Sequence, residues 1–413
     1  MVDFGWRKNV KITAADIPEF TDEIWFGIEF NQQIDPGVLP DSLKIIEFCE
    51  EYDQPIGPGV LPNSLETIIF GRDFNQPIAA NTMPNSLKTI IFGRDFNQPI
   101  AANTLPNSLK TIRFGRNFNQ PIAANTLPNS LKTIRFGRNF NQPIAANTLP
   151  NSLKIIKFGY HFNQAIEMNV LPNSLKSLKF GFSFDQPIGQ RVLPESIENI
   201  TFGQYFNQPI GMNVLPNSLK SLKFGWAFNQ PIGLGILPDF LETIDFGLCF
   251  NQPIGLGTLP DFLETIEFGL CFNQPIGKNI LPAFLKCIKY GSDYTQPISA
   301  IYQLDHLEHI SICTKKSIEI NVELLPPSLK YLSISNSDIL VSLNAYSQIM
   351  WFSVIYDNPG ILLDITYSIL WGPERRGYGY RSIGTETIDG IEYDRVINPK
   401  FYQPRFNAKS ARK

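Results

Sequence analysis

The sequence has few of the residues that carry enzyme chemistry, because only three histidines and five cysteines occur among its 413 residues. It contains no glycine-rich phosphate loop, no nucleophile elbow and no zinc-ribbon spacing. His306 and His309 have a spacing that binds metal on a helix, but the sequence around them follows no regular metal-site pattern. The sequence therefore predicts no catalytic residue, no cofactor and no metal, and it favours a non-enzymatic protein.

Long apolar runs and strong net charge are also lacking. The longest apolar run, residues 361–371, is interrupted by Asp364 and is too short to span a bilayer. The polar residues 1–10 do not resemble a secretory signal. The formal net charge of −3 gives no general attraction to nucleic acid or to an anionic membrane. Residues 371–413 are basic, with nine Lys and Arg against five Asp and Glu, and the role of this tail is open.

A short tandem repeat occupies most of the chain. Its phase is marked by prolines at every 22nd position from Pro18 to Pro282, and weaker copies continue beyond them. Units of this length cannot bury a core alone, so they stack into a solenoid. We expect about 15 to 16 coils over residues 18–356, an N-terminal cap at 1–17, and a C-terminal cap with the basic tail at 357–413.

Each unit contains the alternation of a short strand. In one copy, Ile112 and Phe114 alternate with Thr111 and Arg113, and Gly115 follows. A two-residue period indicates a strand with one buried face. We expect strands near residues 43–48, 65–70 and 87–92 and onward at the same offset, in one parallel sheet. Little α-helix is expected, because Pro and Asn interrupt every unit.

A column of side-chain amides accompanies the apolar pattern. Glutamine recurs at every 22nd position from Gln32 to Gln296, and Asn precedes it in most units. Amides stacked at one coil spacing can bond the backbone of the neighbouring coil. We expect a scaffolding role for this column. Cys249 and Cys271 also occupy equivalent positions, which permits either a disulfide or two small apolar side chains in a reducing cytosol.

The unit Leu-Pro-Asn-Ser-Leu-Lys-x-Ile-x-Phe-Gly-x-x-Phe-Asn-Gln-Pro-Ile, as in residues 105–122, resembles the FNIP repeat, a relative of the leucine-rich repeat. The resemblance covers most of the chain. It implies an all-β-rich, leucine-rich-repeat-like solenoid of the kind found in amoebae and in giant viruses that infect amoebae. Members of the family often carry an F-box, for which the short segment before the first repeat leaves no room. The implied location is the cytoplasm, or the host cytoplasm or virus particle for a viral protein.

Two columns of outward residues predict a binding surface. The strand column is basic in the middle of the array and acidic towards both ends, whereas the column after the glycine passes from arginines to aromatic residues. Trp, Tyr and Arg are enriched in binding hot spots. The candidate protein-binding residues are Arg113, Arg116, Arg135, Arg138, Lys157, Lys179, Tyr160, Phe182 and Trp226. For the arginines, a solvated face without a ligand is the alternative.

These features favour an interaction scaffold that presents one solenoid face to a protein partner. One alternative is a structural component of a larger assembly, such as a virus particle or a self-packing array. Another is a substrate adaptor of a ubiquitin ligase, which the missing F-box disfavours. The sequence does not favour a nucleic-acid, membrane or small-molecule partner, and it leaves the partner's identity, the oligomeric state and the curvature of the sheet open.

Overall fold

The computed structural model describes residues 2–3, 9–27, 29–313, 320, 324–335, 351–355, 364–367, 382–388 and 391–396. The chain forms two compact units, Met1–Leu263 and Glu264–Lys413, which are taken in turn. The boundaries of the expected caps stay a prediction.

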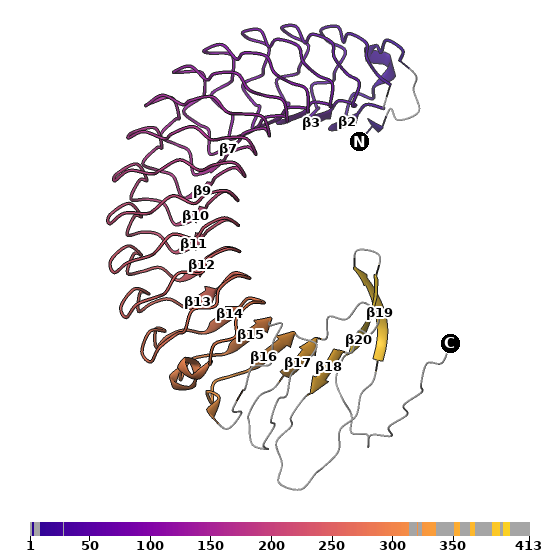
Figure 1. Cartoon of the computed structure of the whole chain (residues 1–413). Coiled ribbons are helices and arrows are strands. Elements are labelled where there is room, and N and C mark those ends of the chain that lie inside the picture. Colours follow the sequence, from indigo (N-terminus) through magenta and orange to yellow (C-terminus); the bar gives the residue numbers. More distant parts are fainter. Residues whose placement is uncertain are drawn as a thin grey trace. The chain divides into compact units, whose positions relative to one another are not determined.

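The first unit is a stack of coils, each with one short strand. Adjacent strands pair in parallel at equivalent positions of successive repeats, so that Thr111, Ile112 and Arg113 lie beside Thr133, Ile134 and Arg135. The strands line the inner side of the curved stack in Figure 1. They are β1 (Val2–Asp3), β2 (Glu23–Trp25), β3 (Ile45–Glu47), β4 (Thr67–Ile69), β5 (Thr89–Ile91), β6 (Thr111–Arg113), β7 (Thr133–Arg135), β8 (Ile155–Lys157), β9 (Ser177–Lys179), β10 (Asn199–Thr201), β11 (Ser221–Lys223) and β12 (Thr243–Asp245).

The second unit begins with the same arrangement. Strands β13 (Thr265–Glu267), β14 (Cys287–Tyr290), β15 (His309–Cys313), β16 (Tyr331–Ser335) and β17 (Trp351–Ile355) pair in parallel. Strand β18 (Asp364–Tyr367) pairs with β17 in the antiparallel sense. Strands β19 (Ser382–Ile388) and β20 (Ile391–Val396) form an antiparallel hairpin, whose connecting residues Asp389 and Gly390 lie outside the described residues.

The predicted leucine-rich-repeat-like parallel solenoid is confirmed. Within the described ranges the only helical segments are the 3-10 turns η1 (Ala14–Asp16) and η2 (Ser299–Gln303). The strands are shorter than expected, with three residues in place of six in most coils. The reason is that a turn precedes each strand: in one coil the backbone N–H of Leu109 donates to the carbonyl of Pro106 at 3.1 Å, and the strand begins only at Thr111.

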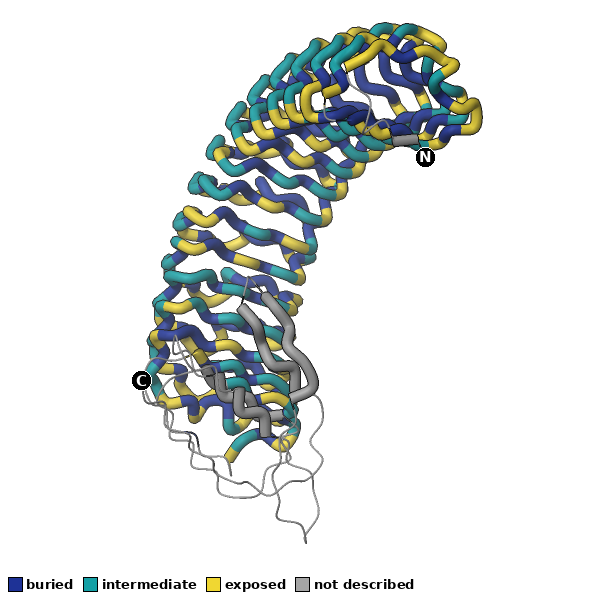
Figure 2. Tube along the Cα trace, turned by 90° about the vertical axis from the view of Figure 1, so that its right-hand side faces the viewer, coloured by how far each residue is buried: buried dark blue, intermediate teal, exposed yellow. Residues whose placement is uncertain are grey.

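Phenylalanine rings fill the core of every regular coil. Phe114 and Phe118 stack with ring centroids 3.9 Å apart, and Phe118 stacks on Phe140 of the next coil at 6.1 Å. Phe118, Phe140 and Phe162 are at most 1% exposed. Figure 2 shows buried residues recurring in each coil of the stack. A coil alone would leave these rings half in water, so burial ties each coil to its neighbours.

Two polar ladders connect the coils of the first unit. The Oδ1 atom of Asn97 accepts the backbone N–H of Asn119 at 2.9 Å and the side-chain N–H of Gln120 at 3.3 Å. This confirms the expected scaffolding role of the amide column. A serine ladder adds to it, because the hydroxyl of Ser108 donates to the carbonyl of Leu87 at 2.7 Å and its counterparts do the same.

The residues expected to cover the ends fall largely outside the described structure. The N-terminal segment at 4–8 and the basic end at 400–413 are not described. Of the expected C-terminal cap at 357–413, only the backbones of β18, β19 and β20 are described. Cys249 belongs to the first unit and Cys271 to the second, and both are half-buried thiols. Among the residues that the structure describes, no helix is long and apolar enough to cross a membrane.

Candidate protein-binding surface

The inner strand face carries a row of cations in the first unit. The third residue of each strand points away from the core, and four successive strands place Arg113, Arg135, Lys157 and Lys179 in register there. Lys157 is half-buried and the other three are exposed. In water, like charges at a coil spacing of about 5 Å repel by about 0.8 kcal/mol. A row of this kind therefore slightly lowers the stability of the folded protein.

A second row of cations runs beside the first, directly after the strands. Arg94, Arg116 and Arg138 each follow a glycine that lies against the glycine of the preceding coil. A Cβ on Gly137 would come within 1.6 Å of the carbonyl oxygen of Gly115, so only glycine allows the coils to approach this closely. The close approach brings the arginines of successive coils together at the edge of the strand face.

The two rows line an open groove with a volume of about 690 Å³. We call it the cation groove and define it by the charged residues that line it: Arg94, Arg113, Arg116, Arg135, Arg138 and Lys157. Five of the nine predicted site residues are thus brought together, and Arg94 joins them. Lys179 lies on the next strand beyond Lys157.

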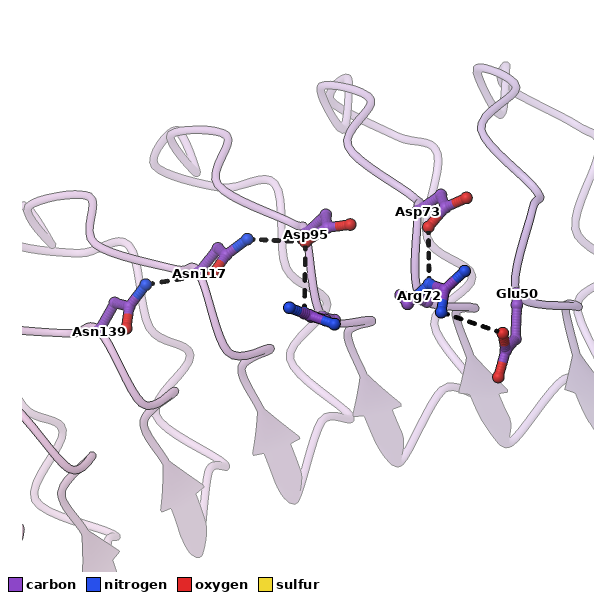
Figure 3. Close-up of polar contacts among 7 residues, drawn as sticks. Glu50, Arg72, Asp73, Asp95, Asn117 and Asn139 are labelled. Carbon is purple, nitrogen blue, oxygen red and sulfur yellow. Dashed lines mark hydrogen bonds and ion pairs between the residues drawn. The ribbon is translucent and has the colours of Figure 1, made fainter.

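The neighbours of the second row change from charged to neutral along the stack. Arg72 lies 3.0 Å from Asp73 and 3.4 Å from Glu50, and Arg94 lies 3.9 Å from Asp95. In the next two coils asparagines replace these aspartates, and Figure 3 shows the resulting chain from Asp95 through Asn117 to Asn139. Among the described residues, Arg113, Arg116, Arg135 and Arg138 have no carboxylate within ion-pair distance.

The charges in the groove act on one another. The guanidinium of Arg135 is the main cause that lowers the pKa of Lys157, followed by partial burial and by Lys179. Elsewhere in the first unit, lysines face carboxylates of the adjacent coil, as in Lys88 with Glu66 at 2.7 Å and Lys176 with Glu198 at 2.6 Å. The hydrogen bond from Lys176 lowers the pKa of Glu198. The cation groove is therefore a local exception to charge pairing.

Aromatic side chains continue the second row beyond the groove. The ring of Tyr160 stacks on Phe182 with centroids 4.3 Å apart, and Arg138 lies 4.6 Å from the centre of the Tyr160 ring. Tyr205 meets the edge of Phe182 at 4.9 Å, and Trp226 follows two coils after Phe182. We call Tyr160, Phe182, Tyr205 and Trp226 the aromatic ledge. Tyr160 and Phe182 are half-buried against each other, whereas Tyr205 and Trp226 are 57% and 54% exposed.

Sequence reasoning missed three features of this region. Tyr205 stands one position later in its unit than the other aromatic residues, so a strict column does not include it. Arg94 has Asp95 as its neighbour, which suggests a paired charge, although its side chain lines the groove. Phe240 and Phe262, which replace the ladder serines, are exposed and stack at 5.6 Å. The replacement of serine by phenylalanine at these positions is the sequence feature that could have predicted these exposed rings.

The histidine pair does not form a metal site in the described part of the chain. His306 stacks on Phe284 at 5.4 Å and His309 on Tyr331 at 4.5 Å. No group of three or more potential metal ligands occurs among the described residues.

Comparisons with known proteins match these repeats. The profile of the FNIP Repeat family matches residues 9–50, 52–95, 96–139, 140–183, 184–226, 228–271 and 272–314. A solved structure, CroV588, is a circular leucine-rich-repeat protein of the giant virus CroV. It aligns with a TM-score of 0.78 and 46% identity over 82% of this chain and 50% of its own. The chain thus spans about half the length of that protein.

A second solved structure, the mouse RP105/MD-1 complex, is similar at 11% identity over 82% of this chain and 71% of its own, with a TM-score of 0.48. That likeness is too distant to inform function. No curated protein matches the sequence.

Proposed function

Since this chain belongs to the FNIP repeat family, whose leucine-rich-repeat-like fold is typical of interaction scaffolds, we propose that it is a non-enzymatic scaffold that binds a partner protein on the strand face of its first unit. The observation that carries the proposal is the aromatic ledge beside the cation groove. Solenoids use extended inner surfaces of this kind to bind other proteins.

The composition of the ledge supports a protein partner. Trp, Tyr and Arg are enriched in binding hot spots, and Tyr and Trp offer large, rigid contact areas at a small cost in side-chain entropy. Tyr160 and Phe182 are held in place by stacking, and Trp226 and Tyr205 present more than half of their surface. A preformed ledge of this kind needs little reordering when a partner docks.

A pull-down with the full chain tests the proposal. The double variant Phe182→Ser and Trp226→Ser should fold normally, because neither side chain belongs to the core, and it should lose partner capture. The control is Phe240→Ser, which removes another exposed aromatic ring and restores the residue found at Ser218. It should leave capture unchanged. Full capture by the double variant would exclude the ledge as the docking surface.

We also infer that the protein acts in the cytoplasm, either of its own cell or of a virus-infected host. The sparse set of five cysteines supports a reducing compartment, and the likeness to CroV588 supports the viral setting. Fractionation of infected and uninfected cells with an antibody to the chain tests this location.

A further inference from the structure

We propose that the cation groove binds an acidic peptide segment of the partner, a stretch of Asp and Glu flanked by an apolar residue that rests on the aromatic ledge; this specification rests on the proposed function. Guanidinium groups recognise carboxylates through paired hydrogen bonds. The ledge begins where the groove ends, since Tyr160 stacks under Arg138.

The charge distribution along the chain is the first support. Residues 96–184 contain ten Lys and Arg but a single acidic residue, Glu167. The whole chain has 35 Lys and Arg against 38 Asp and Glu, which leaves 25 against 37 for the remainder. A nearly neutral protein has thus gathered positive charge at the coils that form the groove. Such a region attracts and orients a negatively charged partner.

The exchange of aspartate for asparagine is the second support. Successive coils read Arg72-Asp73 and Arg94-Asp95 on one side, and Arg116-Asn117 and Arg138-Asn139 on the other. The outward strand residue changes at the same point, from Ile91 to Arg113. The first two arginines have a carboxylate within 4.0 Å, whereas the last two have none among the described residues. The amides form a hydrogen-bonded row that begins at Asp95, because Asn117 donates to Asp95 and Asn139 to Asn117. The exchange removes the negative charge beside each of these two arginines.

The geometry of the rows favours a short peptide. Strands β6 to β9 span three coil steps of about 4.8 Å, or about 14 Å in total. An extended peptide covers that length with four or five residues. Glu50, Asp73 and Asp95 border the row at one end, and Asp245 pairs with Lys223 towards the other. A nucleic-acid strand running along the stack would meet these carboxylates, so a short acidic segment fits the surface better.

Fluorescence anisotropy with the full chain tests the inference. The probe is a labelled peptide of six alternating Asp and Glu residues followed by Phe, and the reference peptide has Asn and Gln in their place. We expect binding of the acidic peptide only, and weakening of its binding between about 50 and 200 mM salt because the charges are exposed.

The decisive variant is Asn117→Asp with Asn139→Asp. It recreates the Arg–Asp neighbours of the two preceding coils without touching an arginine, and it should weaken binding by about tenfold. The reverse change, Asp73→Asn with Asp95→Asn, should tighten it. Arg116→Gln should weaken binding, whereas its matched control Arg72→Gln should have little effect because Arg72 is already paired with Glu50 and Asp73. Circular dichroism verifies that each variant is folded.

Equal binding by the wild type and the Asn117→Asp, Asn139→Asp variant would overturn the inference. So would tighter binding of a twelve-nucleotide single-stranded DNA than of the acidic peptide, which would assign the groove to nucleic acid. The proposed function is judged separately. If Phe182 and Trp226 are needed for capture but the acidic peptide does not bind, the scaffold function is supported and the acidic segment of the partner is rejected. If the peptide binds but capture does not depend on those aromatic residues, the aromatic ledge is rejected as the docking surface.

Discussion

At the scale of single residues, the stack depends on positions that tolerate only one side chain. The glycine that follows strands β4 to β11 is the clearest case, because the ideal Cβ positions in this column from Gly71 to Gly225 lie 1.5–1.9 Å from a carbonyl oxygen of the preceding coil. No rotamer relieves a clash between a Cβ and the backbone. This column therefore sets the distance between coils.

Gly137→Ala should destabilise the first unit by about 3 kcal/mol or more, since the coils must separate to admit the methyl group. A fall in the denaturation midpoint measures the effect. Gly211→Ala is the matched control, because its Cβ would meet only the Cγ2 atom of Val214 at 3.8 Å. A control variant as unstable as Gly137→Ala would contradict the assigned cause.

Arg191 is a second special residue. It adopts φ of 63°, in the left-handed region where seven other coils place Asn. A long side chain is strained there by about 1 kcal/mol relative to Asn or Gly. Arg191→Asn should therefore raise the melting temperature, and the converse change Asn169→Arg should lower it. A lower melting temperature for Arg191→Asn would mean that the arginine makes a compensating contact.

The sequence predicted the buried residues because their period is strict, and it predicted which columns face outward. It did not predict the pairing of Asn117 with Asp95 or the stacking of Tyr160 on Phe182. Those contacts depend on side-chain conformations, which the sequence of a repeat does not specify.

At the scale of elements, the amide ladder adds hydrogen bonds between coils, of which a three-residue strand makes few. The Oδ1 atom of Asn141 accepts two hydrogen bonds from the next coil, from the backbone of Asn163 at 2.9 Å and from the side chain of Gln164 at 3.2 Å. The register of short strands is weakly specified by their own hydrogen bonds, so these bridges fix it. The strand length was overestimated from sequence because the apolar alternation continues into the turns.

Asn141→Leu should cost about 1–3 kcal/mol, since two donors lose their acceptor in a partly buried place. Urea denaturation gives the measurement. Asn141→Asp should be nearly neutral at pH 7, because Asp185 fills the same role for Asn207 and Gln208 at 2.9 and 3.0 Å. Similar losses for both variants would show that the acceptor oxygen is not what matters.

At the scale of the whole molecule, the sequence carries its organisation in a repeat that is legible without a structure. Residues 101–122 and 123–144 are identical, and their strands pair in register. The repeat unit alone does not show how the coils differ from one another, for example that, among the described residues, the arginines after Arg94 have no ion pair. The cation groove follows from that contrast and not from the repeat itself.

Removal of residues 123–144 should leave a folded protein, because the deletion joins equivalent positions and keeps every register. Circular dichroism should show an unchanged spectrum per residue, and binding of the acidic peptide should weaken because Arg135 and Arg138 are lost. Removal of residues 123–133 alone is the control and should unfold the region, since it shifts the phase by half a coil. Similar stability of the two deletions would contradict the role of the repeat register.

The glycine column has a consequence for how such a chain can change over generations. Each glycine lies against a backbone carbonyl of the preceding coil, so it cannot accept a bulkier residue unless the two coils move apart. A coil that arises as a copy of its neighbour brings a matching glycine with it and needs no further adjustment. Lengthening by duplicated segments is therefore the easy route for this architecture, and with each copy of residues 101–122 the chain would inherit two more arginines without a single carboxylate.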